Sequence, residues 1–254
     1  MKLTDTHAHL DDERLWDDLD AAIGRAQDAG VDRILAVGSN LASSRRAVDA
    51  AHRYSIVYAA VGVHPHDARS FGEESEEVEA LLDAEKVVAV GEIGLDHYRL
   101  LSPVAAQMHA FTTQLGWAKE RGLPVSVHNR DADEPVLDAL RDSGVPAVMH
   151  AFSSTAHTAN RALEIGCSIS FAGNLTYRRS DELRALAASL PADRLLIETD
   201  SPVLAPQPRR GRTNEPAYVS FVAECLAEVR GVAVEDLCAQ TAANASRVFG
   251  WGPA

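Results

Sequence analysis

The sequence has few cysteines, no long apolar run and fewer basic than acidic residues. Its three cysteines, Cys167, Cys225 and Cys238, lie far apart and outside any Cys-x-x-Cys pair. This spacing argues against a disulfide framework and against a thiolate zinc site, and it favours a reducing compartment. No run of about 18 apolar residues is present to span a membrane, and the N-terminus lacks the basic and then apolar pattern of a secretory signal. We therefore expect a cytoplasmic protein that does not enter a membrane.

Acidic residues outnumber basic ones by 37 to 24, so the formal net charge is −13. Sequence-independent adhesion to nucleic acid requires a basic face, and this charge disfavours it. A site that handles phosphate is still compatible with the charge, because bound metal ions can supply local positive charge. The 46% of hydrophobic residues excludes intrinsic disorder.

Short β-rich runs alternate with segments of helical spacing along the whole chain. The predicted strands are Lys2–Thr6, Arg33–Gly38, Ile56–Val63, Val87–Ile93, Pro124–Val127, Pro146–Met149, Ser168–Ala172 and Leu195–Thr199. Helical segments between and after them include Arg14–Ala29, Ser43–Arg53, Pro103–Arg121, Pro135–Asp142, Ala156–Ile165, Asp181–Ser189, Glu215–Val229 and Val234–Phe249. Glycines expected to end helices are Gly30, Gly122, Gly144 and Gly166.

Apolar strands that alternate with helices indicate parallel strands buried on both faces. Eight such units in 254 residues predict an α/β protein with a (β/α)8 TIM-barrel fold. The alternative is a doubly wound open sheet, which normally carries a glycine-rich fingerprint in its first βα turn. Here that turn reads His-Ala-His-Leu-Asp, so the barrel is favoured. Without a linker or a change in composition, we expect one domain over residues 1–254.

Histidines and carboxylates follow six of the eight predicted strands. In a barrel of this class the active site forms at the carboxyl ends of the strands. The residues at these ends that can ligate a metal are His7, His9, Glu92, His128, His150 and Asp200. Each has a plainer explanation when taken alone, such as a loop histidine, a core histidine, a salt-bridged carboxylate or a helix-capping aspartate. Their convergence on one rim is the argument for a metal site.

Six nitrogen and oxygen ligands are too many for one tetrahedral zinc ion with an open position. They suit two divalent ions that share a bridging carboxylate. A carbamylated lysine cannot be the bridge, because Lys2 and Lys86 open strands and Lys119 lies within a helix. Glu92 is therefore the candidate bridge. Asp5 shares a strand face with His7 and His9, and we expect it to orient a ligand.

Arginines are concentrated in two loops that follow the seventh and eighth predicted strands. They are Arg178, Arg179, Arg209, Arg210 and Arg212. Phosphate sites of barrels often lie at these loops, and guanidinium groups suit phosphate, although solvated surface charges would explain them as well. Arg130 lies two residues after His128 and is a further candidate.

The motifs together resemble the TatD family of metal-dependent deoxyribonucleases, within the amidohydrolase-like barrels. The matching segments are Asp5–Leu10, Gly62–His66, Gly91–Asp96, His128–Ala132, His150–Ser153, Glu198–Pro202, Arg210–Pro216 and Thr241–Asn244. The resemblance implies that one ion is held by His7, His9, Glu92 and Asp200, and a second by Glu92, His128 and His150. His97 and Ser154 depart from the family pattern, where an aromatic residue and a glycine are usual.

The resemblance also implies hydrolysis of phosphodiesters in DNA, from the end of a single strand. We expect two divalent ions (Mg²⁺, Mn²⁺ or Zn²⁺) and Asp200 as general base, with Glu92 as the shared catalytic carboxylate. Candidate substrate-binding residues are His64, Arg130, Arg212 and Asn214. DNA is the expected substrate, and no obligate protein partner is predicted.

Two other functions remain open at this stage. The same site could hydrolyse an amide, ester or lactone in a small molecule, because one fold hosts many reactions. The protein could instead be a non-catalytic metal-binding scaffold, although an intact Asp200 argues against that.

Overall fold

The computed structural model describes residues 2–252, and it contains eight β-strands in one sheet order, β1 to β8. The strands are β1 (Leu3–Ala8), β2 (Val31–Val37), β3 (Val57–Val61), β4 (Val87–Asp96), β5 (Val125–Arg130), β6 (Ala147–Met149), β7 (Ser168–Phe171) and β8 (Leu195–Ile197). Pairs β3–β4, β4–β5, β5–β6 and β7–β8 are parallel, and Ala8 forms a parallel bridge with Ser201 beyond β8. This topology confirms the predicted (β/α)8 class.

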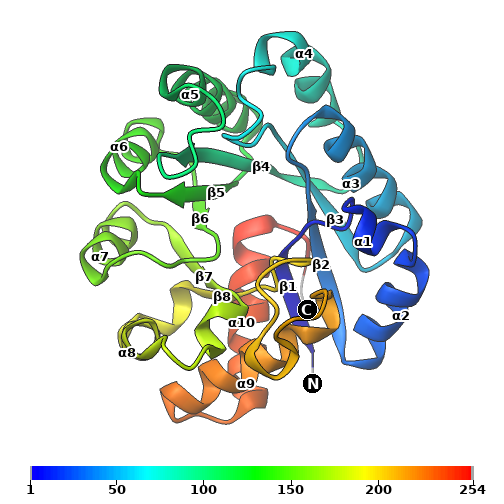
Figure 1. The fold of residues 1–254 in the computed structure, drawn as a ribbon, viewed down its shortest axis with the longest axis vertical. Helices are drawn as coiled ribbons and strands as arrows, with labels where there is room; N and C mark the ends of the chain where they lie inside the picture. Colours follow the sequence, from blue (N-terminus) through cyan, green and yellow to red (C-terminus); the bar gives the residue numbers. More distant parts are fainter. Residues whose placement is uncertain (1, 253–254) are drawn as a thin grey trace. The chain divides into compact units, whose positions relative to one another are not determined.

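Helices follow the strands in chain order (Figure 1). The α-helices are α1 (Glu13–Trp16), α2 (Leu19–Asp28), α3 (Leu41–Arg53), α4 (Phe71–Leu81), α5 (Val104–Arg121), α6 (Asp133–Ser143), α7 (Ala156–Glu164), α8 (Asp181–Ser189), α9 (Val219–Arg230) and α10 (Val234–Phe249). Short 3₁₀ turns are η1 (Gly173–Thr176), η2 (Ala192–Arg194), η3 (Gln207–Arg209) and η4 (Pro216–Tyr218). No helix within residues 2–252 combines the length and apolar character needed to cross a bilayer.

Two predicted helices differ from the structure, and one observed helix was not predicted. The expected helix Arg14–Ala29 is divided into α1 and α2, because the chain turns at Asp17 and Asp18, residues whose short side chains favour helix ends. Helix α4 is not among the helices predicted from the sequence. Its first turn and solvent face consist largely of glutamates. The predicted helix Glu215–Val229 begins as the 3₁₀ turn η4 before α9 continues it. The expected glycine ends are confirmed, with φ between 66° and 90° at Gly30, Gly122, Gly144 and Gly166.

The chain divides into two compact units, which are described separately. Unit 1 contains residues 2–35, 151–153 and 169–252, and unit 2 contains residues 36–150 and 154–168. In unit 1, α10 packs on β1 and β8, and the core includes Leu3, Ile197 and Leu226. In unit 2, α3 packs on β3 and α5 packs on β4, around Val61, Ile93 and Phe111. Each unit thus builds its own apolar core beneath the ends of its strands.

Strands β4 and β5 extend beyond the predicted limits. The sequence predicted that β4 would end at Ile93, whereas the strand continues to Asp96, and β5 continues to Arg130. Gly94 pairs with His128, and Asp96 pairs with Arg130. Gly94 has a φ of 141°, and a Cβ atom there would lie 2.0 Å from the carbonyl oxygen of His128. Only glycine allows this close approach, which places His128 beside β4.

Candidate metal centre

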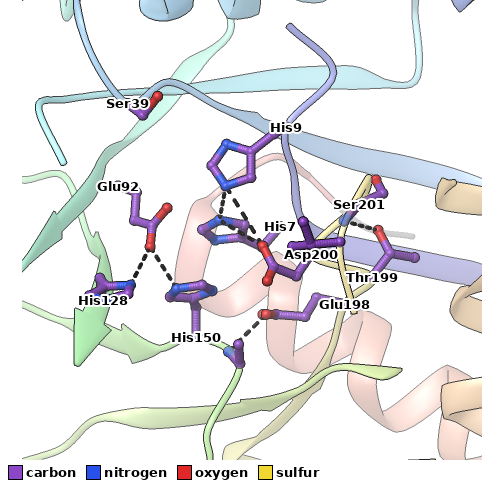
Figure 2. A network of polar contacts seen from close by, with 12 residues as sticks. His7, His9, Ser39, Glu92, His128, His150, Glu198, Thr199, Asp200 and Ser201 are labelled. Atoms are coloured by element: carbon purple, nitrogen blue, oxygen red, sulfur yellow. Dashed lines mark hydrogen bonds and ion pairs between the residues drawn. The ribbon is translucent and has the colours of Figure 1, made fainter. Parts of the chain in front are cut away.

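A first cluster in unit 1 consists of His7, His9 and Asp200. His7 lies within β1, and His9 follows the strand, while Asp200 comes three residues after β8. The backbone N–H of Asp200 donates to the oxygen of His7 over 2.9 Å, and the N–H of His9 donates to the oxygen of Ser201 over 2.8 Å. This parallel pairing brings the two strand ends together, as Figure 2 shows.

Three potential ligand atoms of the first cluster lie close together. The Nε2 atoms of His7 and His9 are 3.3 Å apart, and they lie 4.0 and 3.7 Å from Oδ1 of Asp200. Ligands bound to one ion at about 2.1 Å are separated by roughly 3.0 to 3.4 Å in octahedral or tetrahedral geometry. The cluster therefore fits a divalent ion after shifts of a few tenths of an ångström.

Asp5 supports this cluster through the backbone. Its Oδ1 accepts from the N–H groups of His7 and Thr199, and its Oδ2 accepts from the hydroxyl of Thr199 over 2.6 Å. Complete burial raises the pKa of Asp5 to about 8, against the hydrogen bonds that lower it. Asp5 thus joins β1 to the segment that carries Asp200; its role in orienting a metal ligand stays a prediction.

Asp200 itself has a left-handed backbone, with φ of 52°. Aspartate tolerates this region better than most residues, but at some energetic cost. The conformation is held by the N–H of Val203, which donates to the oxygen of Asp200, and by the N–H of Ser201, which donates to Oγ1 of Thr199. These contacts hold the backbone from which the carboxylate of Asp200 projects.

A second cluster in unit 2 is centred on Glu92, which is buried within β4 (Figure 2). One carboxylate oxygen, Oε1, lies 2.7 Å from Nε2 of His150, 3.0 Å from Nδ1 of His128 and 3.4 Å from Nε2 of His64. Potential ligand atoms of Glu92, His128 and His150 all lie within 4.8 Å of one another. Three imidazoles around one buried carboxylate oxygen form a donor set suited to a divalent transition metal or Mg²⁺.

The electrostatics of the second cluster keep Glu92 ionised. Burial acts to raise its pKa, but the neighbouring imidazoles of His150, His64 and His128 outweigh this and hold the pKa well below the usual range. Burial likewise acts to lower the pKa of His128, yet hydrogen bonds to Asp96 and Glu92 raise it. Metal binding requires the carboxylate to be ionised, which is the state in which Glu92 is held.

The prediction missed Asp96 and His66 as members of this site. Asp96 is fully buried, and its Oδ2 lies 2.7 Å from Nε2 of His66 and 3.3 Å from Nε2 of His128. Because Nδ1 of His128 faces Glu92, Asp96 accepts from the opposite ring nitrogen, the arrangement that orients metal-ligating histidines. The available signal was the spacing of Glu92 and Asp96, four residues apart and therefore on one face of a strand.

His64 lies against Glu92 and is largely buried. The backbone N–H of His66 donates to its Nδ1 over 3.0 Å, which places the ring proton on Nε2, the atom nearest Glu92. Burial lowers the pKa of His64 to about 4, so the ring is neutral at neutral pH. A contact between His64 and substrate stays a prediction.

The other predicted substrate residues lie in different surroundings. Arg130 is exposed, with its guanidinium carbon 4.2 Å from the ring centre of Tyr98, and Arg212 is also exposed. Asn214 is fully buried, and its amide nitrogen donates to the carbonyl oxygens of Thr199 and Val203. Asn214 therefore braces the loop after β8, and a contact with substrate stays a prediction for all three.

Two of the loop arginines and the two residues that depart from the family pattern make local contacts within the protein. Arg209 stacks on Tyr218, and Arg210 stacks on Tyr177 at 4.2 Å from the ring centre, whereas Arg178 and Arg179 are exposed. The hydroxyl of Ser154 donates to Asp133, a contact that glycine could not make. The backbone N–H of His97 donates to the carbonyl oxygen of Arg130, a contact that does not depend on the histidine side chain.

Comparison with known proteins gives one consistent family. The family model described as TatD related DNase matches residues 4–250. A Bacillus subtilis protein named as an uncharacterized metal-dependent hydrolase, YabD, is 41% identical, over 97% of this chain and 98% of its own length. A Cronobacter sakazakii protein named 3'-5' ssDNA/RNA exonuclease TatD is 42% identical, over 91% of this chain and 92% of its own. The crystal structure of YJJV, a TatD homolog from Escherichia coli K12, superimposes with a TM-score of 0.90 at 30% identity and covers 98% of both chains.

The fold, the two clusters of histidines and carboxylates able to bind metal, and these similarities define a metal-dependent hydrolase built on a (β/α)8 barrel. The chain belongs to the TatD family.

Proposed function

We propose that this hydrolase cleaves phosphodiester bonds in DNA, and that it acts on the ends of single strands. The observation that carries the proposal is the buried donor set of each cluster, which combines imidazoles with an acid and contains no thiolate. Relatives named as 3'-5' ssDNA/RNA exonucleases, at 42% and 36% identity, favour a nucleic-acid substrate.

Two divalent ions are proposed, with Glu92 serving both, as the strand-end positions of the six residues predict. His7, His9, Glu92 and Asp200 would hold one ion, and Glu92, His128 and His150 the other. Bound divalent ions lower the pKa of water and neutralise charge that develops on phosphoryl oxygens. The metals that suit phosphate chemistry with these ligands are Mg²⁺, Mn²⁺ and Zn²⁺.

The protein's own residues supply the remaining chemistry. Asp200 accepts the proton of the attacking water. Its carboxylate projects from a constrained backbone and lies beside the imidazoles of His7 and His9. Asp96 holds His128 in the orientation that directs Nδ1 toward Glu92. Exposed arginines, among them Arg130 and Arg212, bind the phosphates of the strand.

The direct test is hydrolysis of labelled single-stranded DNA after chelation and after return of Mg²⁺, Mn²⁺ or Zn²⁺. Activity should disappear with chelator, return with metal, and fall at least about 100-fold in Glu92→Gln and Asp200→Asn. Glu79→Gln is a matched control, because Glu79 is a surface carboxylate bound to Arg121. Unchanged nuclease activity in both site variants, or faster turnover of lactone or amide substrates than of DNA, would refute the proposal.

A further inference from the structure

The loop between β4 and α5 presents an unusual concentration of exposed apolar side chains. Among residues 2–252, four of the six large apolar side chains that are exposed fall within residues 98–104. Tyr98 is 62% exposed, Leu100 53% and Leu101 54%. Exposed apolar side chains gathered in one segment indicate a surface that binds something.

This loop is held rigidly. Oδ1 of Asp96 accepts from the backbone N–H groups of Tyr98 and Arg99, over 3.0 and 2.7 Å. The hydroxyl of Ser102 donates to the carbonyl oxygen of His66 over 2.7 Å, and the buried amide of Gln107 donates to the oxygen of Ser102. The apolar side chains therefore project from a backbone that is already ordered, so that binding a ligand costs little backbone entropy in this loop.

The loop is also tied to the second cluster. Asp96 makes both sets of contacts. Its Oδ1 holds the backbone of the loop, and its Oδ2 contacts His66 and His128. A cleft of about 420 Å³ begins at His66 and is lined by Arg69 and Leu101, among others. Whatever binds the loop thus lies next to the residues that are expected to hold metal.

The chemistry of this surface matches a nucleobase. The guanidinium of Arg130 lies over the ring of Tyr98, and Arg99, the next residue along the chain, is exposed, in a protein whose net charge is −13. Proteins commonly bind single-stranded nucleic acid through aromatic rings that lie next to arginines. The bases stack on the rings, and the phosphates between the nucleotides bind the guanidinium groups. Asp67 and Glu73 also line the cleft; they repel phosphate but can accept from the exocyclic amino groups of bases.

We propose that Tyr98, Leu101 and Arg130 form a base-stacking platform that holds the single strand beside the second cluster. The platform rests on the proposed nuclease function and extends it by naming residues that bind bases. Arg130 and Arg99 contact the adjoining phosphates, and the base nearest the metal-binding residues enters the cleft at His66.

The test compares two labelled single strands of equal length, one of thymidines and one of abasic residues. With the thymidine strand, Tyr98→Ala should raise KM by about five-fold or more and leave kcat within about two-fold, because one base–aromatic stack is lost. Tyr98→Phe keeps the ring and should behave as wild type. Val232→Ala is the matched control, since Val232 is 46% exposed and lies in unit 1.

The abasic strand separates stacking from general effects. Wild type should bind it at least as weakly as Tyr98→Ala binds the thymidine strand, and Tyr98→Ala should bind the abasic strand no more weakly than wild type does. Fluorescence anisotropy in an Asp200→Asn background gives the affinities without turnover, and Arg130→Gln provides a second variant should Tyr98→Ala fold poorly. An unchanged KM and affinity in Tyr98→Ala, or an equal loss for both strands, would overturn the platform while the nuclease proposal stands. A wild type that neither binds nor cleaves DNA would overturn both.

Discussion

Replacing Asp96 with asparagine tests how the second cluster is organised. Asp96 is fully buried; one oxygen accepts from the backbone of Tyr98 and Arg99, and the other lies 2.7 Å from His66 and 3.3 Å from His128. Asparagine keeps one acceptor for the loop but presents an amide N–H₂ to the two histidines. The substitution therefore removes the orienting contact on His128 at nearly constant volume.

The expected result is a selective loss of metal affinity. Outer partners of ligating histidines typically contribute about 10- to 100-fold in affinity, which corresponds to about 1.4 to 2.7 kcal/mol. Isothermal titration of the chelator-stripped protein with Mn²⁺ or Zn²⁺ should show one of two binding steps weakened by that factor and the other unchanged. Asp133→Asn is the control, because Asp133 accepts from Asn129, Ser154 and Thr158, outside the cluster. Wild-type affinity for both ions in Asp96→Asn would refute the orienting role.

Three further predictions concern stability. Gly94→Ala should destabilise the protein by about 3 kcal/mol or more, because the position has a φ of 141° and an added Cβ would meet the backbone of His128 at 2.0 Å; an unchanged urea midpoint would contradict the close approach. Asp133→Asn should cost about 1 kcal/mol at neutral pH. Burial acts to raise the pKa of Asp133, but hydrogen bonds from Ser154, Thr158 and Asn129 lower it below the usual 3.8, so the difference should shrink as pH falls through and below that value. A difference that grows with acid would show the wrong sign. Asn214→Ala should cost about 2 kcal/mol, because the buried carbonyl oxygen of Thr199 and the partly buried one of Val203 lose their donor; a thermal midpoint equal to that of wild type would argue against the bracing role.

The fold class was predictable because its signal is repeated along the chain. Alternation of apolar strands with helices recurs eight times, and left-handed glycines mark four helix ends. Local boundaries were less predictable. The ends of β4 and β5 carry Gly94, Asp96 and Asn129, which have low strand propensity, and the pairing between the two strands holds them extended.

The placement of these histidines and acids at strand ends was also predictable, because parallel strands end at the same edge of a sheet; their role as metal ligands stays a prediction. The hydrogen bonds that these side chains form with other residues were less predictable. Asp96 ends the short Gly94–Asp96 segment, which gives no sign of burial in the sequence, and its role depends on a contact with His128, 32 residues further along. Asn214 was predicted to bind substrate because it lies in an arginine-rich loop, yet its side chain is fully buried and donates a hydrogen bond to the backbone. Sequence spacing identifies which side chains share a strand end, but not which hydrogen bonds they form there.

The central claim is that six histidines and acids from five strand ends bind two divalent ions. Metal content per chain, measured by mass spectrometry on protein purified without chelator and then equilibrated with excess Mn²⁺ or Zn²⁺, tests it most directly. The account predicts two ions in wild type, and fewer than two in Glu92→Gln. A single ion in wild type, or two ions retained when Glu92 is replaced, would contradict it.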